Sequence, residues 1–335
     1  MPLLLAGIDE AGYGPLLGPL CVGCAAFELD APADDPPPCL WTLLRGAVCR
    51  AANDRRARIA VEDSKKLKGA KDAAAHPLRH LERGVTAFAS VAAAGTDGFP
   101  TDTALLGALS ALPSPADGPW HADAHPLPVG NDAAALRIAS SMLRTTLAKA
   151  RASVALLTVE ALGPTDLNAQ AARIGNKATI NFMAAMRHVD RVRALAAARG
   201  THAWIALDRQ GGRTAYLDPL RTSFPEAQLA VLEESDATAR YRLAWPATRA
   251  LPAHAATVSF ELGGEERNLP IALASMAAKF ARELHMRRLN AYFAAHIPGL
   301  EPTAGYVQDG RRFLDAVGDA PERLGIPRHA LVRAV

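Results

Sequence analysis

Residues 3–19 read LLLAGIDEAGYGPLLGP, an apolar run that meets two acids and then a turn rich in glycine and proline. Residues 3–8 predict a buried strand, and a second apolar run at 19–28 predicts the next one. The glycines and prolines between them indicate a tight connection. Asp9 and Glu10 thus stand at the end of a buried strand, where a charge is costly unless water, a metal or a partner receives it. This strand end is the first candidate site.

Strand geometry alone cannot bring the side chains of Asp9 and Glu10 into one site, because successive side chains of a strand face opposite ways. Either the turn at Gly12–Gly14 rotates one carboxylate, or Glu10 contributes mainly through its backbone carbonyl. A solvated strand end without function is the third interpretation that the dipeptide leaves open.

The composition narrows the class of protein. The length of 335 residues allows one large domain or two ordinary ones, and 50% hydrophobic residues can fill a substantial core. The net charge of +3 neither requires nor excludes a polyanionic partner. Four cysteines are too few for a disulfide framework, and no apolar stretch approaches the length of a membrane helix. We therefore expect a cytoplasmic protein without a membrane association.

The pattern of elements along the chain alternates between strands and helices, which favours an α/β layered domain. The segments 30–38 and 95–130 are rich in Pro, Gly and Asp, and the second is expected to be a surface insertion rather than part of the core. Further strands are expected at 153–159, 204–207, 229–232, 239–244 and 256–262, and helices at 40–52, 78–93, 133–152, 176–199, 270–293 and 310–317.

Asp208 repeats the first arrangement, because a short apolar strand at 203–207 ends in this one carboxylate. Two buried strands that end in acids at one sheet edge would make a hard-oxygen site suited to Mg²⁺ or Mn²⁺, whose charge relieves the repulsion between them. Glu265 and Glu266 offer a third source of carboxylates. They precede the helix at 271–279, whose many small residues allow a close approach to a sheet.

These residues together resemble the ribonuclease HII family. The match begins with GIDEAGYGPLLGP at 7–19 and DSKKL at 63–67, which are specific as a pair. It continues in family order to about residue 312, through Asp166-Leu167-Asn168, 176–179, 183–187, Asp208, Gly264-Glu265, 271–279 and Gly305-Tyr306.

The resemblance implies a ribonuclease H-like α/β fold, with a mixed central sheet flanked by helices and a C-terminal helical extension. It places the catalytic domain at 1–290, with insertions near 30–55, 97–131 and 213–256, and the extension at 291–335. The implied activity is metal-dependent endonucleolytic cleavage of the RNA strand of RNA–DNA hybrids, including embedded ribonucleotides. The implied partner is such a nucleic acid, and we expect a monomer.

The resemblance also implies roles for single residues. Two divalent ions, Mg²⁺ or Mn²⁺, would be held by four acids that are both catalytic and metal-binding: Asp9, Glu10, Asp208 and Glu265. The substrate would be bound by Gly12, Tyr13, Gly14, Ser64, Lys65 and Tyr306.

Two departures from the family pattern keep alternatives open. Tyr13 stands where the family usually has a basic residue, and Glu265 stands where it usually has Asp, with Glu261 and Glu266 as other candidates for this acid. A non-catalytic nucleic-acid-binding protein of the same fold is therefore the alternative function. A nuclease of this fold that acts on another structured substrate is a further one.

Three other groups favour plain structural roles. Cys21 and Cys24 have a zinc-like spacing but lie in an apolar strand, so core packing is the better interpretation. His121, Asp123 and His125 could hold a metal, but their Pro-rich surroundings favour a surface loop. Four arginines could widen a nucleic-acid footprint or complement helix dipoles: Arg287, Arg288, Arg311 and Arg312.

Overall fold

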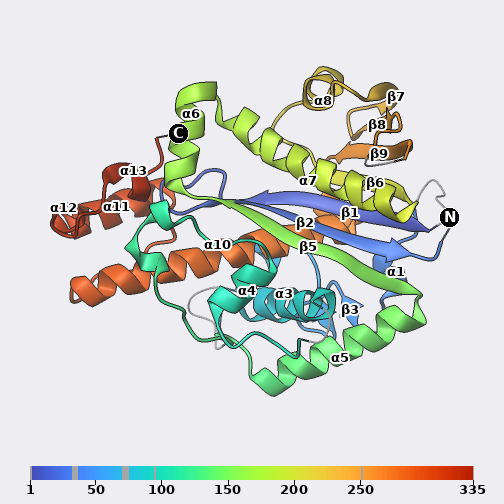
Figure 1. Cartoon of the computed structure of the whole chain (residues 1–335). Coiled ribbons are helices and arrows are strands. Elements are labelled where there is room, and N and C mark those ends of the chain that lie inside the picture. The colour runs from blue at the N-terminus through green and yellow to red at the C-terminus, as the bar shows by residue number, and fades with distance from the viewer. Residues whose placement is uncertain (1, 32–36, 70–74, 94–95, 250–251, 335) are drawn as a thin grey trace.

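A seven-stranded mixed sheet forms the centre of the molecule (Figure 1). The computed structural model describes residues 2–31, 37–69, 75–93, 96–249 and 252–334. The sheet has the order β5-β2-β1-β6-β9-β8-β7. Its strands are β1 (Leu3–Ala11), β2 (Leu20–Leu29), β5 (Ala152–Leu162), β6 (His202–Asp208), β7 (Gln228–Glu234), β8 (Thr238–Trp245) and β9 (His254–Glu261).

The parallel part of the sheet is formed by β1, β6 and β9, whereas β2, β5, β8 and β7 join it in antiparallel pairs. The expected α/β architecture with a mixed central sheet is confirmed. β1 is buried on both faces, as its continuous apolar run predicts.

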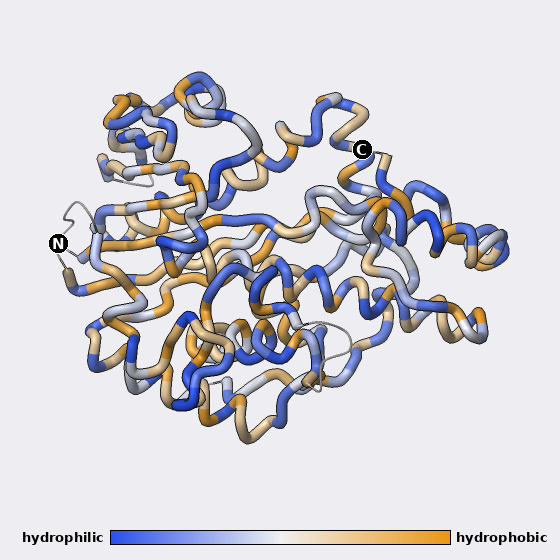
Figure 2. Tube along the Cα trace, turned by 180° about the vertical axis from the view of Figure 1, so that it is seen from behind, coloured by the Kyte–Doolittle hydropathy of each residue, from blue (hydrophilic) through white to orange (hydrophobic). Residues whose placement is uncertain are grey.

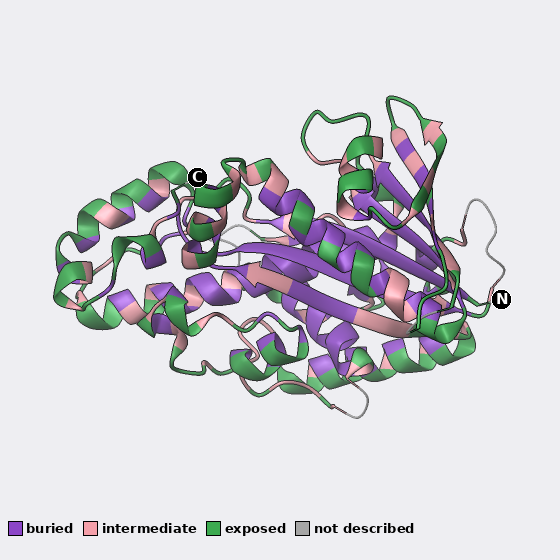
Figure 3. Ribbon diagram, turned by 45° about the horizontal axis from the view of Figure 1, so that its top comes forward, coloured by how far each residue is buried: buried purple, intermediate pink, exposed green. Residues whose placement is uncertain are grey.

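Helices cover both faces of the sheet. On one face α7 (Lys177–Arg199) packs against the side of β1 that carries Leu4, Ala6 and Ile8. On the other face α10 (Leu269–His296) packs against β1 and β2, with α3 (Arg79–Ala92) and α5 (Ala133–Lys149) beyond it. The central strands and the inner sides of these helices are the buried part of the molecule (Figure 3).

The remaining elements are short. They are α1 (Leu40–Leu43), β3 (Val48–Cys49), β4 (Ile59–Ala60), α2 (Ser64–Leu67), α4 (Asp102–Ala108), η1 (Pro115–Asp117), η2 (Pro119–His121), α6 (Pro164–Ile174), α8 (Leu217–Ser223), α9 (Gly264–Arg267), α11 (Val307–Val317), α12 (Ala320–Arg323) and α13 (Arg328–Leu331).

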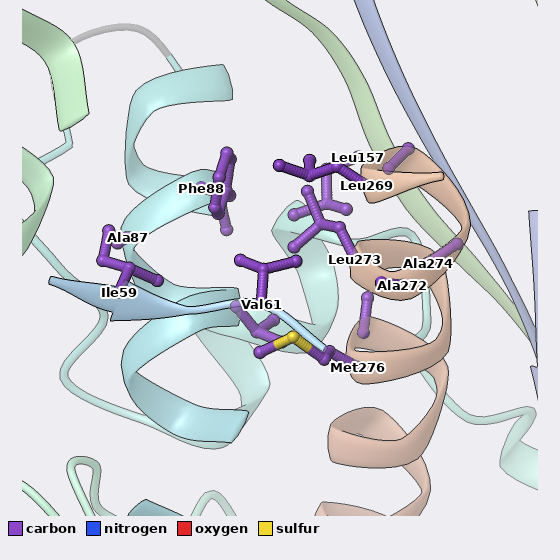
Figure 4. Packing of buried hydrophobic residues seen from close by; sticks show 14 of the residues in the cluster. Ile59, Val61, Ala87, Phe88, Leu157, Leu269, Ala272, Leu273, Ala274 and Met276 are labelled. Carbon is purple, nitrogen blue, oxygen red and sulfur yellow. The ribbon is translucent and has the colours of Figure 1, made fainter. Parts of the chain in front are cut away.

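The closest packing in the fold is between α10 and the sheet. A Cβ atom at Gly7 would overlap the backbone of Pro270 and Ile271, and one at Gly23 would overlap the carbonyl of Ala274. The small residues of the helix and these two glycines together allow backbone to lie on backbone. The close approach expected from the sequence is thus confirmed. On its outer side the same helix packs Met276 and Leu273 near Phe88 and Val61 (Figure 4).

Two sequence expectations are wrong in part. The helix expected at 40–52 ends at Leu43, and the chain then forms β3, which pairs with β4. The insertion expected on the surface at 95–130 instead contributes to the core. Its helix α4 buries Leu105 and Leu106 completely, and Leu109, directly after the helix, is also fully buried. Their apolar side chains lie among many polar loop residues, which hid them in the composition. Residues 32–36, within the loop expected at 30–38, lie outside the described residues.

The last part of the chain packs on the far end of α10. Phe313 and Val317 of α11, together with Ile326 and Leu331, form a small core with Phe293 of α10. A boundary between residues 290 and 291 would fall inside α10, so the division into 1–290 and 291–335 stays a proposal.

Apolar and polar residues are interspersed along the trace (Figure 2). Within the described residues, no helix combines the length and the apolar character that a membrane span requires.

The helix–sheet contact gives a stability prediction. Gly23→Ala should lower the free energy of unfolding by about 3 kcal/mol or more, because the added methyl meets backbone that cannot turn away. Gly212→Ala is the matched control, since a Cβ there meets no atom within 4 Å. Urea unfolding of both variants measures the difference. Equal midpoints for the two variants would show that α10 does not lie this close to β2.

Candidate active site

A pocket of about 240 Å³ opens at the carboxyl ends of β1 and β6. It is lined by residues from both strands, the following turn, α2, α9, α10 and the start of α11: Asp9, Glu10, Ala11, Gly12, Tyr13, Gly14, Pro15, Ser64, Lys65, Asp208, Glu265, Ser275, Lys279 and Tyr306. All ten residues that the sequence singled out for a catalytic or binding role are among them.

Asp9 and Asp208 lie at the same edge of the sheet, as the sequence predicted. β1 and β6 are parallel neighbours, and Ile8 pairs with Leu207 one residue before the two acids. Leu207 packs on the α7 side of the sheet, so the alternation of the strand turns Asp208 to the α10 side. Gly7 faces α10, and so Asp9 does as well.

Glu10 keeps the alternation of the strand, because β1 continues to Ala11. Its side chain therefore lies on the α7 side of the sheet, where it accepts a hydrogen bond from Asn181. Asn181 is buried in α7. The carboxylate still reaches the pocket, because the pocket spans the end of the sheet rather than one of its faces.

Glu265 is the one of the three candidate glutamates that enters the pocket. Its Oε1 lies 2.5 Å from the Ser275 hydroxyl of α10, and the neighbouring Gly264 N–H donates to Asp208 Oδ1 at 2.9 Å. The Glu261 carboxylate instead accepts from the Ser259 hydroxyl at 3.0 Å. Glu266 has a side chain that is 63% exposed and pairs with Lys66 at 2.7 Å.

The carboxylates of the pocket disfavour one another's ionisation. Burial raises the pKa of Asp9 well above its ordinary value, and the charges of Glu10 and Glu265 add to this. Burial also raises the pKa of Glu10 and of Asp208, with further repulsion from Glu265 in both cases. The hydrogen bonds from Asn181 and Gly264 oppose these shifts without cancelling them. A positive charge in the pocket would relieve this repulsion.

Lys65 supplies one such charge at the rim. Burial alone would lower its pKa, but the carboxylates of Glu265, Asp63, Asp9 and Asp208 outweigh burial and raise it. The side chain is exposed, and its backbone N–H is held by Asp63 Oδ1 at 2.8 Å. Ser64 is buried, and its hydroxyl lies 3.0 Å from that of Ser275.

Two exposed tyrosines flank the pocket, each with cations against its ring. Lys177 Nζ lies 4.8 Å from the ring centre of Tyr13, which is 39% exposed. Lys279 Nζ lies 5.9 Å and the Arg282 guanidinium 5.6 Å from the ring centre of Tyr306. Such pairs offer an apolar face and a positive charge together, a combination that suits the sugar and phosphate of a nucleic acid.

Sequence reasoning missed several residues that shape the pocket. Ser275 and Lys279 of α10 both line it, and Asn181 of α7 holds Glu10. A signal for the first two was present, since two polar residues four apart on an otherwise apolar small-residue helix share one face. Asn181 had no comparable signal.

The zinc-like cysteine pair is structural. Cys21 and Cys24 are buried in β2, and burial raises the pKa of each thiol to about 12. Neither thiol is ready to ligate a metal.

The histidine motif of the insertion does not form a metal site either. The backbone N–H of His125 donates to Asp102, His121 is partly buried beside His285, and Asp123 is exposed.

The expected arginine footprint is wrong for Arg288. Its guanidinium is buried in α10 and paired with Asp102 at 2.6 Å, so it ties the insertion to the core. Arg312 is exposed but pairs with Asp309 at 2.8 Å.

The pocket has an oxygen donor set of the kind that hard divalent cations prefer. Four carboxylates and the hydroxyls of Ser64 and Ser275 line it, and no thiol or imidazole does. Across the described ranges, however, no three acidic, imidazole or thiol groups already stand close enough to hold an ion. The donor types thus fit a metal of this class.

The fold and the pocket define an α/β protein with an acid-lined cleft at the carboxyl ends of adjacent parallel strands. No protein-family model matches the chain, and no curated protein matches its sequence.

Solved structures of RNases HII and HIII are similar to it over nearly its full length. RNase HII from Archaeoglobus fulgidus, seen in complex with PCNA, is 15% identical with a TM-score of 0.39 over 99% of this chain and 94% of that one. Ribonuclease H2 from Pyrococcus horikoshii is 13% identical with a TM-score of 0.42 over 98% and 92%. Bst-RNase HIII in complex with Mn²⁺ is 14% identical with a TM-score of 0.42 over 99% and 66%.

The repulsion in the pocket gives a stability prediction. Asp9→Asn should raise the free energy of unfolding of the protein in EDTA by about 1 kcal/mol or more near neutral pH, since each unit of pKa shift is about 1.4 kcal/mol. The carboxylate with a raised pKa costs stability above that pKa, and this cost disappears as the pH falls and Asp9 takes up a proton.

Denaturant unfolding from neutral to acidic pH measures this effect, and the gain should shrink toward acidic pH. The control is Glu266→Gln, outside the pocket and paired with Lys66, which should show no gain. An Asp9→Asn variant less stable than the parent at neutral pH would contradict the repulsion.

Proposed function

We propose that the pocket is the active site of a divalent-metal-dependent endoribonuclease that cleaves the RNA strand of RNA–DNA hybrids, including embedded ribonucleotides. The observation that carries the proposal is the set of four carboxylates, from β1, β6 and α9, that line one pocket beside Lys65. Such a set can neutralise cations, and a lysine at its rim can bind a phosphate.

The residues that would hold the metal are Asp9, Glu10, Asp208 and Glu265. When bound, Mg²⁺ or Mn²⁺ supplies Lewis-acid stabilisation of charge on a phosphate and on its leaving 3′-oxygen, leaving 5′-phosphate products. The protein's part is to hold the carboxylates in place. Gly264 N–H orients Asp208, the Ser275 hydroxyl orients Glu265, and Asn181 orients Glu10.

The other residues of the pocket would bind the nucleic acid. Lys65 would hold a phosphate as a point charge, and Tyr306 would pack its exposed ring on a sugar or base. The backbone of Gly12–Gly14 would approach the 2′-hydroxyl that distinguishes RNA from DNA. Gly14 supports this role, since nothing in the protein lies within 4 Å of the position of its missing Cβ.

Cleavage of labelled duplexes that contain one ribonucleotide, several or none tests this proposal. With Mg²⁺ or Mn²⁺ the protein should cut only the ribonucleotide-containing strands, and EDTA should stop it. Binding without cleavage in either metal would favour the alternative, a non-catalytic nucleic-acid-binding protein. Cleavage of the all-DNA duplex would favour a nuclease with another substrate.

Asp208→Asn should lower kcat by about a thousand-fold or more while hybrid affinity stays within about two-fold, because the amide keeps the shape and removes a ligand charge. Gel assays at saturating Mg²⁺ and fluorescence anisotropy measure the two quantities. Glu266→Gln is the matched control outside the pocket and should cleave like the parent. Undiminished turnover by Asp208→Asn would exclude the role we give to this acid.

Tyr13→Arg should strengthen hybrid binding and steepen its salt dependence by about one unit of log–log slope, since each phosphate contact contributes about 0.9. Gly14→Ala should fold normally, because its methyl has free space in the protein, yet lose about ten-fold or more in kcat/KM by keeping the substrate away. A salt series of binding and cleavage for both variants checks this pair. Parent-like behaviour in both would show that the turn does not contact the substrate.

A further inference from the structure

The turn at 12–18 is held from outside by residues far along the chain. The N–H groups of Leu16 and Leu17 donate to the carbonyl of Gly305 at 2.8 and 3.1 Å. The carbonyls of the turn point to buried guanidinium groups. Arg333 donates to Gly12 O and to Gly18 O, each at 2.6 Å, and to Pro15 O at 3.3 Å. One side chain thus ties the beginning, the middle and the end of the turn together.

The backbone around Arg333 reinforces this contact. Its own N–H donates to Leu16 O at 3.0 Å, and Val332 forms a β-bridge with Leu17. Asn168 of α6 holds the segment from the other side, because its amide donates to His329 O and Val332 O at 3.0 and 2.9 Å and accepts from Ala334 N–H at 2.6 Å. The segment 329–334 is therefore a strap fixed between α6 and the turn.

Arg282 of α10 lies behind the same turn. It donates to Leu17 O at 3.2 Å and to Ala304 O at 2.9 Å. Gly12 has a φ of +85°, and a Cβ there would press on the Arg282 side chain. The turn is thus shaped around this arginine.

Burying two arginine side chains beneath a turn costs free energy of folding. Arg282 is fully buried and Arg333 is 2% exposed. In the part of the chain that the structure describes, the hydrogen bonds of both side chains go to backbone carbonyls rather than to a carboxylate, and each retains N–H groups without a partner. Buried unpaired charge costs more stability than apolar packing would. Plain stability of the fold therefore does not explain the arrangement.

What the guanidinium of Arg333 adds is a defined geometry of the turn. Planar N–H groups in a fixed fork hold three carbonyls at set directions, which an apolar side chain cannot do. Gly12, Tyr13 and Gly14 line the pocket, and Arg333 holds the Gly12 carbonyl at the start of this stretch. The positive charge beneath the turn also favours a nearby phosphate, where Tyr13 itself carries none.

We propose that Arg333 is a positioning residue that sets how strongly the pocket discriminates ribonucleotides from deoxyribonucleotides, by fixing the Gly12–Gly18 backbone. This deepens the proposed function and rests on it, since the turn reads the substrate only if the pocket cleaves hybrids. Arg333 does not line the pocket and acts through the turn alone.

The test compares Arg333→Gln and Arg333→Lys with the parent in the full chain. Arg323→Gln is the matched control, an exposed arginine nearby in the sequence that pairs with Asp319. Hydrogen–deuterium exchange is measured for the backbone N–H groups of residues 13, 14 and 16–18 and, as an internal reference, for those of β7 and β8. In both Arg333 variants the turn should exchange about ten-fold faster or more while the reference strands stay unchanged. The lysine variant should be affected less, because it keeps the positive charge and can still donate hydrogen bonds, although without the planar fork of the guanidinium.

The second readout is the ratio of the affinity for a duplex with one ribonucleotide to the affinity for the all-DNA duplex of the same sequence, with KM and kcat measured separately on the ribonucleotide-containing duplex. We expect KM to rise about ten-fold for the single-ribonucleotide duplex, kcat to change less than about three-fold, and Arg333→Lys to recover part of the loss. A merely structural role would instead lower the thermal midpoint, speed exchange throughout and leave the ratio unchanged.

The outcomes separate the two proposals. Unchanged exchange at 13–18 in Arg333→Gln overturns the positioning role, whatever the activity. Faster exchange at the turn with an unchanged substrate ratio overturns the link to discrimination. A parent that cleaves no duplex overturns the proposed function and this link with it, while the exchange data still decide whether Arg333 holds the turn.

Discussion

The backbone contact between α10 and the first two strands is the constraint on which the rest of the structure depends. Gly7 and Gly23 remove the side chains that would hold the helix away, and the small residues of the helix do the same from the other side. Because the helix lies this close, Ser275 and Lys279 reach the strand ends, and Arg282 reaches the turn behind Gly12. A helix at an ordinary distance would leave the acids of β1 and β6 without their hydroxyl and cationic neighbours.

The buried acids of the pocket lower the stability of the fold. Asp9, Glu10 and Asp208 all have raised pKa values, caused first by burial and then by neighbouring acids. The large apolar clusters on both faces of the sheet offset this cost. Repulsion of this kind between carboxylates is tolerated where a bound cation would relieve it. Groups with such shifted pKa values concentrate at functional sites.

Much of the fold and of the pocket could be predicted from local sequence. The apolar strands ending in Asp9 and Asp208, the glycine-rich turn and the small-residue helix are all short patterns, and each leads to the observed element. What could not be predicted depends on distant contacts. Arg288 looks like a surface charge in the sequence, because its partner Asp102 lies 186 residues earlier. Arg333 contacts Gly12, which lies 321 residues before it, and no local pattern indicates this contact. Leu105 and Leu106 were hidden by their polar surroundings for the same reason.

The central claim is that the acids of the pocket bind divalent cations together. Anomalous diffraction from crystals grown with Mn²⁺ measures this most directly, because it locates the ions independently of activity. We expect manganese between Asp9, Asp208 and Glu265, with Glu10 at the side of α7, and its loss in crystals of Asp208→Asn. Well-ordered crystals with no manganese at these acids at millimolar Mn²⁺, or with manganese only at other sites, would contradict the claim.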